Sequence, residues 1–267
     1  MKTFKLAIPL AAAGFLWSLN ASAQFTYNNS DLLLGFRTPG GTSDLLVDIG
    51  SVSLYTGATA PITISGNYYT ASQLTDAGLS LNNLYFSVFG DVSPGYPATY
   101  GPYNTLWVTA PEAVPGTLTT PWAAQTSTQL GFSRSRIESI GAGGNFLGAT
   151  TAPGADNTAN AIVTSDSFSQ SGDNSYAVGI GPNGNFQGNF GSDNNIENIT
   201  PGSFTSGGVI SDLYEMRPDQ GGLLLGQFEL ASDGTMTFNP VPEPTTWATF
   251  GMGLLGLAGW RRIFCKN

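Results

Sequence analysis

SDLLLGFRT at Ser30–Thr38 is the first of two apolar runs that indicate a β fold. The second is DLLVDIGSVSLY at Asp44–Tyr55. Both runs are apolar and alternate over part of their length, a pattern typical of β-strands. Pro39-Gly40-Gly41 lies between them and is a turn signal. The two runs therefore predict a pair of neighbouring strands.

The same pattern returns further along the chain and predicts a β-rich body. Strands are expected at Leu84–Val92, Thr105–Ala110, Gly222–Leu230 and Thr235–Phe238. The last two flank Asp233-Gly234, a dipeptide that favours a tight hairpin. Helices are expected at Thr70–Leu79 and Ser127–Ile140. The predicted fold is mainly β, a β-sandwich-like body with one or two short helices, plus an N-terminal signal peptide and a C-terminal hydrophobic helix.

Composition excludes several kinds of site. The 267 residues include no histidine and a single cysteine, Cys265. Without them the chain cannot build a Ser-His-Asp or Cys-His catalytic set, a His or Cys zinc site, or an intramolecular disulfide. Because 41% of the residues are hydrophobic, a packed core is expected all the same. We predict no catalytic residues, no metal and no cofactor.

The charges are distributed unevenly along the chain. The stretch 24–244 contains four arginines and all 18 acidic residues, which gives it a net charge of −14. A surface this acidic repels phosphate backbones. A nucleic-acid partner is therefore not expected.

The N-terminus has the three parts of a secretory signal peptide. Two lysines lie in Met1–Lys5, Leu6–Leu19 is apolar, and Ala21-Ser22-Ala23 is a small-x-small cleavage site. The apolar part would form about 21 Å of helix, short of a hydrocarbon core of about 30 Å. We expect cleavage after Ala23 and export of the rest; the alternative is a retained anchor helix.

The C-terminus combines a proline cluster, an apolar segment and a basic end. Pro240-Val241-Pro242-Glu243-Pro244 cannot continue a helix and predicts an extended spacer. Thr245–Trp260 carries no charge, and as a helix it would be about 24 Å long, a marginal membrane span. Arg261-Arg262 would stay on the cytoplasmic side, which leaves the body outside.

This tail resembles the PEP-CTERM sorting signal of bacterial surface proteins. The motif falls on Val241, Pro242, Glu243 and Pro244, and the basic stop on Arg261 and Arg262. The resemblance implies an exosortase as processing partner, transient inner-membrane anchoring, a cut near the motif, and delivery to the cell surface or an exopolysaccharide matrix. The chain then divides into a signal peptide at 1–23, a body at 24–239 and a sorting tail at 240–267. The alternative is an ordinary tail anchor.

The function of the body is left open between three classes. A structural or adhesive surface protein agrees with both termini. A carbohydrate-binding module predicts an exposed row of aromatic side chains, drawn from Tyr96, Tyr100, Tyr103 and Trp107. A hydrolase predicts two converging carboxylates, for which Asp44 with Asp48, or Asp212 with Glu215, are local candidates, although the default interpretation of these four residues is exposed surface acids.

Two further patterns each allow a purely structural and a ligand-binding interpretation. Gly181–Asn198 is rich in Gly and Asn and repeats the triplet Gly-Asn-Phe, which also occurs at Gly144–Phe146. It predicts a flexible surface loop or a glycine-tolerant strand pair, and alternatively a carbohydrate-facing surface of Asn amides and Phe rings. Asp193–Glu197 and Asp156-Asn157 offer oxygen ligands for calcium, but neither matches the twelve-residue calcium loop.

Overall fold

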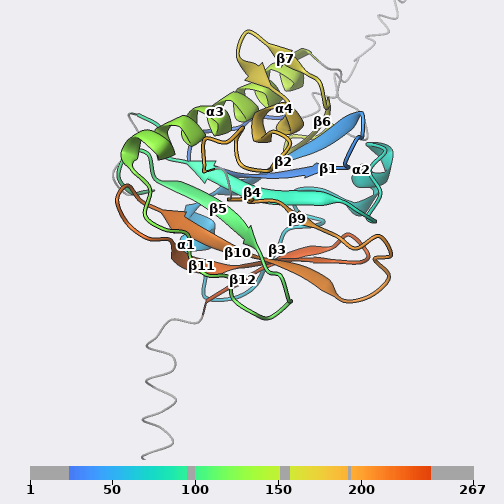
Figure 1. The fold of residues 1–267 in the computed structure, drawn as a ribbon. Helices are drawn as coiled ribbons and strands as arrows, with labels where there is room; N and C mark the ends of the chain where they lie inside the picture. Colours follow the sequence, from blue (N-terminus) through green and yellow to red (C-terminus); the bar gives the residue numbers. More distant parts are fainter. Residues whose placement is uncertain (1–23, 95–99, 151–156, 192–193, 242–267) are drawn as a thin grey trace, which may run out of the picture.

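The computed structural model describes residues 24–94, 100–150, 157–191 and 194–241 (Figure 1). The predicted signal peptide and the predicted helix at Thr245–Trp260 lie outside these ranges. Within them, no helix has both the length and the apolar character that a membrane crossing requires.

One antiparallel sheet of ten strands dominates the described residues. Its order is β3-β12-β11-β10-β5-β4-β1-β2-β6, and β9 pairs with β4 beside that path. The strands are β1 Asp31–Arg37, β2 Ser43–Ser51, β3 Ile62–Thr63, β4 Tyr85–Asp91, β5 Leu106–Pro111, β6 Ala161–Ser165, β9 Asn198–Ile199, β10 Gly208–Met216, β11 Leu223–Ala231 and β12 Met236–Pro240. Outside this sheet lie the ribbon of β7 Ser169–Gln170 and β8 Asp173–Asn174 and the helices α1 Ser53–Thr56, α2 Ala71–Asp76, α3 Ser127–Thr150 and α4 Tyr176–Ile180.

The sheet curls so that its two halves face each other. Figure 1 shows β10, β11 and β12 beneath β1, β2 and β4. Phe36 and Val88 of the upper half and Phe228 and Phe238 of the lower half belong to one buried cluster, the first core. The mainly β prediction is confirmed. The two layers expected of a sandwich are halves of a single sheet, because β5 pairs with both β4 and β10 and joins them.

A second core covers the outer face of the upper half. Leu33 of β1 and Leu46 of β2 pack there with Leu130, Ile137 and Ile140 of α3. The central strands are therefore buried on both faces, with Leu32 and Leu34 pointing into the first core and Leu33 into the second. This double burial is the reason for the consecutive leucines of β1, since neighbouring side chains of a strand point to opposite faces.

Helix α3 is longer than the sequence predicts. It continues ten residues past Ile140 to Thr150, through Gly141, Gly143 and Gly144. These glycines let the helix approach its neighbours: a Cβ at Gly141 would lie 2.1 Å from the Tyr27 ring, and one at Gly143 would lie 2.2 Å from the Asn174 carbonyl oxygen. With α3 at this length and four helices in the described part of the chain, the prediction of one or two short helices is wrong.

The predicted turns and the first predicted helix are confirmed. At Pro39-Gly40-Gly41, the Gly41 N–H donates to the Thr38 carbonyl at 2.9 Å. At Asp233-Gly234, Gly234 has a φ of +82°, a left-handed conformation that glycine adopts without strain. Helix α2 begins at a capping box between Thr70 and Gln73. The run predicted to Tyr55 stops as a strand at Ser51, and α1 follows it.

The glycine- and asparagine-rich segment is packed rather than an exposed loop. Phe186, Phe190 and Ile196 are fully buried and belong to the second core. Phe186 meets Phe89 of β4 edge to face, with ring centroids 5.8 Å apart. The predictions of a flexible surface loop and of Phe rings facing a carbohydrate are therefore wrong at these positions.

Gly143→Ala should destabilise the protein, because the added methyl group meets backbone atoms of Asn174 that cannot give way. We expect a loss of about 1–3 kcal/mol in the free energy of unfolding, typical of overpacking. Gly131→Ala in the same helix is the matched control, since its nearest atoms belong to the Asn104 side chain at 3.3 Å or more. Denaturant unfolding of both variants measures the difference. Equal stability of the two variants would contradict this account of α3.

Candidate functional site

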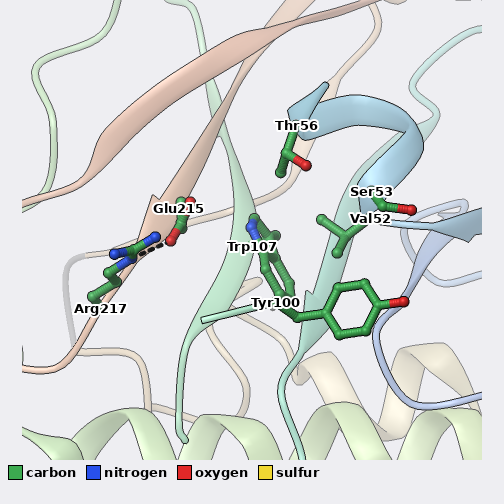
Figure 2. Close-up of a pocket in the computed structure, with 7 residues that line it drawn as sticks. All are labelled: Val52, Ser53, Thr56, Tyr100, Trp107, Glu215 and Arg217. Carbon is green, nitrogen blue, oxygen red and sulfur yellow. Dashed lines mark hydrogen bonds and ion pairs between the residues drawn. The ribbon is translucent and has the colours of Figure 1, made fainter. Parts of the chain in front are cut away.

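A hollow of about 380 Å³ opens at one end of the first core (Figure 2). Its wall comes from α1, β5, β10 and the residue Tyr100 that precedes β5. The described residues that line it are Val52, Ser53, Thr56, Tyr100, Trp107, Glu215 and Arg217. The hollow therefore combines an apolar floor with hydroxyl, indole, carboxylate and guanidinium groups.

Strand pairing places Trp107 at the centre of this hollow. Trp107 lies opposite Glu215 on β10 and opposite Gly90 on β4. Directly paired residues point to the same face of a sheet, so Trp107 and Glu215 are neighbours, and Gly90 leaves the other side free of a side chain. The indole is 1% exposed, and its Nε1 has no hydrogen-bond partner among the described residues. A residue that lines the hollow thus carries an unpaired donor, and that nitrogen is itself almost fully covered.

An ion pair forms the rim on the β10 side. Arg217 Nε donates to Glu215 Oε1, and Figure 2 shows the pair beside the indole. The Glu215 side chain is 7% exposed and the Arg217 side chain 43%, so the carboxylate lies inside and the guanidinium reaches solvent. Because one carboxylate oxygen holds Arg217, the other remains as an acceptor.

The opposite side of the hollow is the single turn of α1. Ser53 and Thr56 are three residues apart and share one face of the turn. Tyr55 anchors α1 to the core, since its hydroxyl donates to the Ile49 carbonyl at 2.7 Å. Its ring meets Phe238 edge to face, with centroids 5.2 Å apart. The hydroxyl-bearing face of α1 is thereby held against the hollow.

The predicted aromatic row is only partly assembled. Tyr100 and Trp107 line the same hollow, but Trp107 is buried, so the prediction that it is exposed is wrong. Tyr103 is 48% exposed and lies under the Arg134 guanidinium, 4.8 Å from its ring centroid, outside the hollow. Tyr96 lies outside the described residues. Sequence reasoning missed Arg217, although a carboxylate and a guanidinium two residues apart in extended chain point to the same side.

The predicted pair Asp212 and Glu215 does not converge. The two residues lie three apart on β10 and point to opposite faces. Asp212 accepts from the Thr119 N–H at 2.6 Å and from Gln227 Nε2 at 3.0 Å, away from the hollow. This candidate pair is therefore not assembled, and because Asp212 and Glu215 are both buried, the default interpretation of the two as exposed surface acids is wrong.

Asp44 and Asp48 do not form a pair either. Four residues of extended strand separate their backbones by roughly 13 Å. Asp44 accepts from the Ala177 N–H at the start of α4, and Asp48 accepts from the Gly50 N–H. The two carboxyl groups therefore accept hydrogen bonds from different parts of the chain, and the candidate pair of Asp44 and Asp48 is not assembled.

In the two segments considered for calcium, side-chain oxygens of described residues accept hydrogen bonds from the protein itself. Asn157 Oδ1 accepts from the Val163 N–H at 2.9 Å, and Asn195 Oδ1 accepts from the Glu197 N–H at 2.9 Å. The Glu197 carboxylate forms an ion pair with Arg37, with 2.5 Å between Oε2 and the guanidinium nitrogen Nη2. Asp156 and Asp193 lie outside the described residues, and the described ones contain no group of three acidic, His or Cys side chains that could hold a metal.

Comparison with known proteins identifies the tail. The family model of the PEP-CTERM protein-sorting motif matches residues 240–262. The chain carries a PEP-CTERM sorting motif. This motif supports an exported protein that an exosortase sorts. Comparisons with curated proteins and with solved structures gave no match.

The PEP-CTERM motif starts inside the sheet. β12 ends at Pro240, the first matched residue, and the Val241 N–H still donates to the Leu225 carbonyl at 3.1 Å. The other predicted motif residues, Pro242, Glu243 and Pro244, and the basic stop at Arg261 and Arg262 lie within the match and beyond the described residues. The body is therefore held by hydrogen bonds up to the residue before Pro242.

Several carboxyl groups of the body favour the protonated form. Burial raises the pKa of Asp44 to about 8 and that of Asp91 to about 7. Burial and the neighbouring Asp31 raise the pKa of Asp48 as well. Since the ordinary pKa of Asp is about 3.9, the folded protein binds protons that the unfolded chain releases between about pH 4 and pH 8.

The protein should become more stable as the pH falls from 8 to 5. Raised pKa values in the folded state contribute stability that is present at low pH and is lost as the pH rises through 7 to 8. Asp44→Asn should flatten this dependence and stabilise the protein at pH 8 by on the order of 1 kcal/mol. Asp219→Asn, at an exposed site, is the control and should keep the wild-type slope. Thermal unfolding across this pH range is the measurement; a midpoint that rises toward pH 8 would contradict it.

Proposed function

We propose that the protein is an exported bacterial surface or extracellular-matrix protein with a structural or adhesive body. The observation that carries the proposal is the PEP-CTERM match at residues 240–262. In this account the N-terminal signal delivers Gln24 onward across the inner membrane, and the tail holds the chain there until an exosortase-like enzyme cuts it. The mature body then joins the cell surface or an exopolysaccharide matrix.

The charge pattern of the tail supports a transient anchor. Thr245–Trp260 would lie in the bilayer, with Arg261 and Arg262 on the cytoplasmic side, because moving charge through hydrocarbon is costly. Four glycines between Gly251 and Gly259 lower the helix propensity of the segment. A short, glycine-rich span suits an anchor that is later removed.

The end of β12 supports a cut that leaves the body intact. Val241 is the last of the described residues and still donates to the Leu225 carbonyl of β11, and Pro242 follows directly. Proline has no N–H to donate to a strand ladder, so pairing with β11 is disfavoured from this residue onward. A cut beyond Val241 removes none of the described strands from the sheet.

The interior of the body supports a structural rather than a catalytic role. Neither carboxylate pair that the sequence offered converges, and the hollow contains one carboxylate among its described lining residues. Two apolar cores on the faces of one sheet stabilise a body with few charged groups and no disulfide. We therefore propose that the body has no enzymatic activity.

Replacing Pro242-Glu243-Pro244 by alanines should leave uncut protein in the membrane fraction of the native host. The exosortase loses its motif, whereas the apolar span and the arginines remain. The control replaces the exposed Thr59 and Pro61 by alanine and should be processed as the wild type is. Deleting Thr245–Asn267 should release the body without surface retention. Fractionation and immunoblotting measure these outcomes; normal processing of the first variant would contradict the proposal.

A further inference from the structure

We propose that the hollow beside Trp107 binds a neutral saccharide unit. The groups that would contact it are Thr56, Tyr100, Trp107, Glu215 and Arg217. This inference goes beyond sorting and does not depend on the tail, because the described residues that line the hollow all belong to the body.

The first observation is the unpaired indole N–H. Trp107 is 1% exposed and its Nε1 has no partner among the described residues. A buried donor without an acceptor costs about 1–3 kcal/mol. The nitrogen is almost wholly covered, so a ligand oxygen would remove this cost only if the side chains beside the indole shift to admit it.

The second observation is the mixture of donors and acceptors around that N–H. Glu215 offers a carboxylate oxygen, whereas Arg217 and the indole offer N–H groups. A hydroxyl group both donates and accepts, so adjacent hydroxyls can bind the carboxylate and the indole at once. Thr56 adds a hydroxyl on the opposite wall, whereas the Ser53 hydroxyl lies 3.0 Å from the Ser51 hydroxyl and points away from the indole (Figure 2). A polyhydroxylated molecule matches this set better than a purely accepting or purely donating one.

Charge indicates that the saccharide is neutral. Glu215 and Arg217 already neutralise each other at the rim. The remaining body is strongly acidic, with a net charge of −14 over residues 24–244, and would repel an anionic sugar. The half-buried Tyr100 supplies an aromatic surface of the kind that packs on the apolar face of a sugar ring. The volume of about 380 Å³ is within the usual range for small-molecule sites.

The same geometry indicates binding without hydrolysis. Glycoside hydrolysis uses two carboxyl groups about 5–10 Å apart on either side of the bond. Among the described lining residues Glu215 is the one carboxylate, and Asp212 points to the other face of β10. The hollow therefore fits retention of a saccharide, which is useful to a protein of a polysaccharide matrix.

The test is saccharide binding by the full chain, purified in a detergent without a sugar headgroup. An array of neutral hexose, N-acetylhexosamine and uronic-acid oligosaccharides serves as the probe, followed by calorimetric titration of the oligosaccharide retained most strongly. We expect retention of a neutral oligosaccharide. Trp107→Phe should weaken it at least fivefold, the equivalent of one hydrogen bond, and Glu215→Gln at least tenfold.

Two further variants keep the test decisive. Tyr100→Ala alters the rim of the hollow rather than the buried floor, and should weaken binding even if Trp107→Phe fails to fold. Tyr103→Ala removes an exposed tyrosine outside the hollow and should bind as the wild type does. Failure to retain any saccharide, preference for uronic acids, or wild-type affinity of Tyr100→Ala would overturn the inference. None of these outcomes bears on sorting, which the alanine replacement at Pro242-Glu243-Pro244 tests in the host.

Discussion

Strands β1, β2 and β4 have to bury both of their faces, and the rest of the architecture depends on that requirement. A chain with 10% charged residues and one cysteine is held together by apolar burial rather than by disulfides or surface ion pairs. Curling of the sheet covers the inner face with Phe228 and Phe238. Helix α3 and the glycine-rich segment cover the outer face. The hollow beside Trp107 opens at one end of the first core, on the side where α1 faces β5 and β10.

Double burial also brings polar groups into the interior, where each needs a partner. Arg37 of β1 and Glu197 form an ion pair at 2.5 Å, with side chains 14% and 1% exposed. Tyr176 of α4 donates to Glu197 at 2.7 Å and lies 2.8 Å from the Ser87 hydroxyl. Removing one member would leave a buried group unpaired, which costs several kcal/mol. This network fixes the glycine-rich segment against the sheet, so the segment is ordered although its composition predicts a loop.

Local signals in the sequence predicted the local structure. The Pro39-Gly40-Gly41 turn, the Asp233-Gly234 hairpin and the capping box at Thr70 each depend on a few neighbouring residues. Strand β10 was missed because Ser211, Asp212 and Glu215 interrupt its apolar pattern, although all three are buried in the fold. The extension of α3 was missed because its glycines lower the helix propensity, and close packing against Tyr27 and Asn174 compensates for that loss.

The sorting tail and the hollow beside Trp107 also differ in how far the sequence alone predicts them. The sorting tail is contiguous in the chain, so its residues and their order were predicted from the sequence. The hollow joins Tyr100, Trp107 and Glu215 from separate segments, and only the register of β5 against β10 makes the last two neighbours. No periodicity in the sequence specifies that register, so the carbohydrate-binding alternative could name Trp107 only as one candidate for an exposed row of aromatic side chains.

The described body extends to Val241, and we propose that the tail beyond it is removed once it has delivered the protein. The most direct test is mass spectrometry of the mature protein recovered from the surface of the native host. The account predicts a chain that begins at Gln24 and ends close to Pro242-Glu243-Pro244, with the apolar span and the arginines absent. Recovery of a surface protein whose terminal peptide is intact to Asn267 would contradict it and make the tail a permanent anchor.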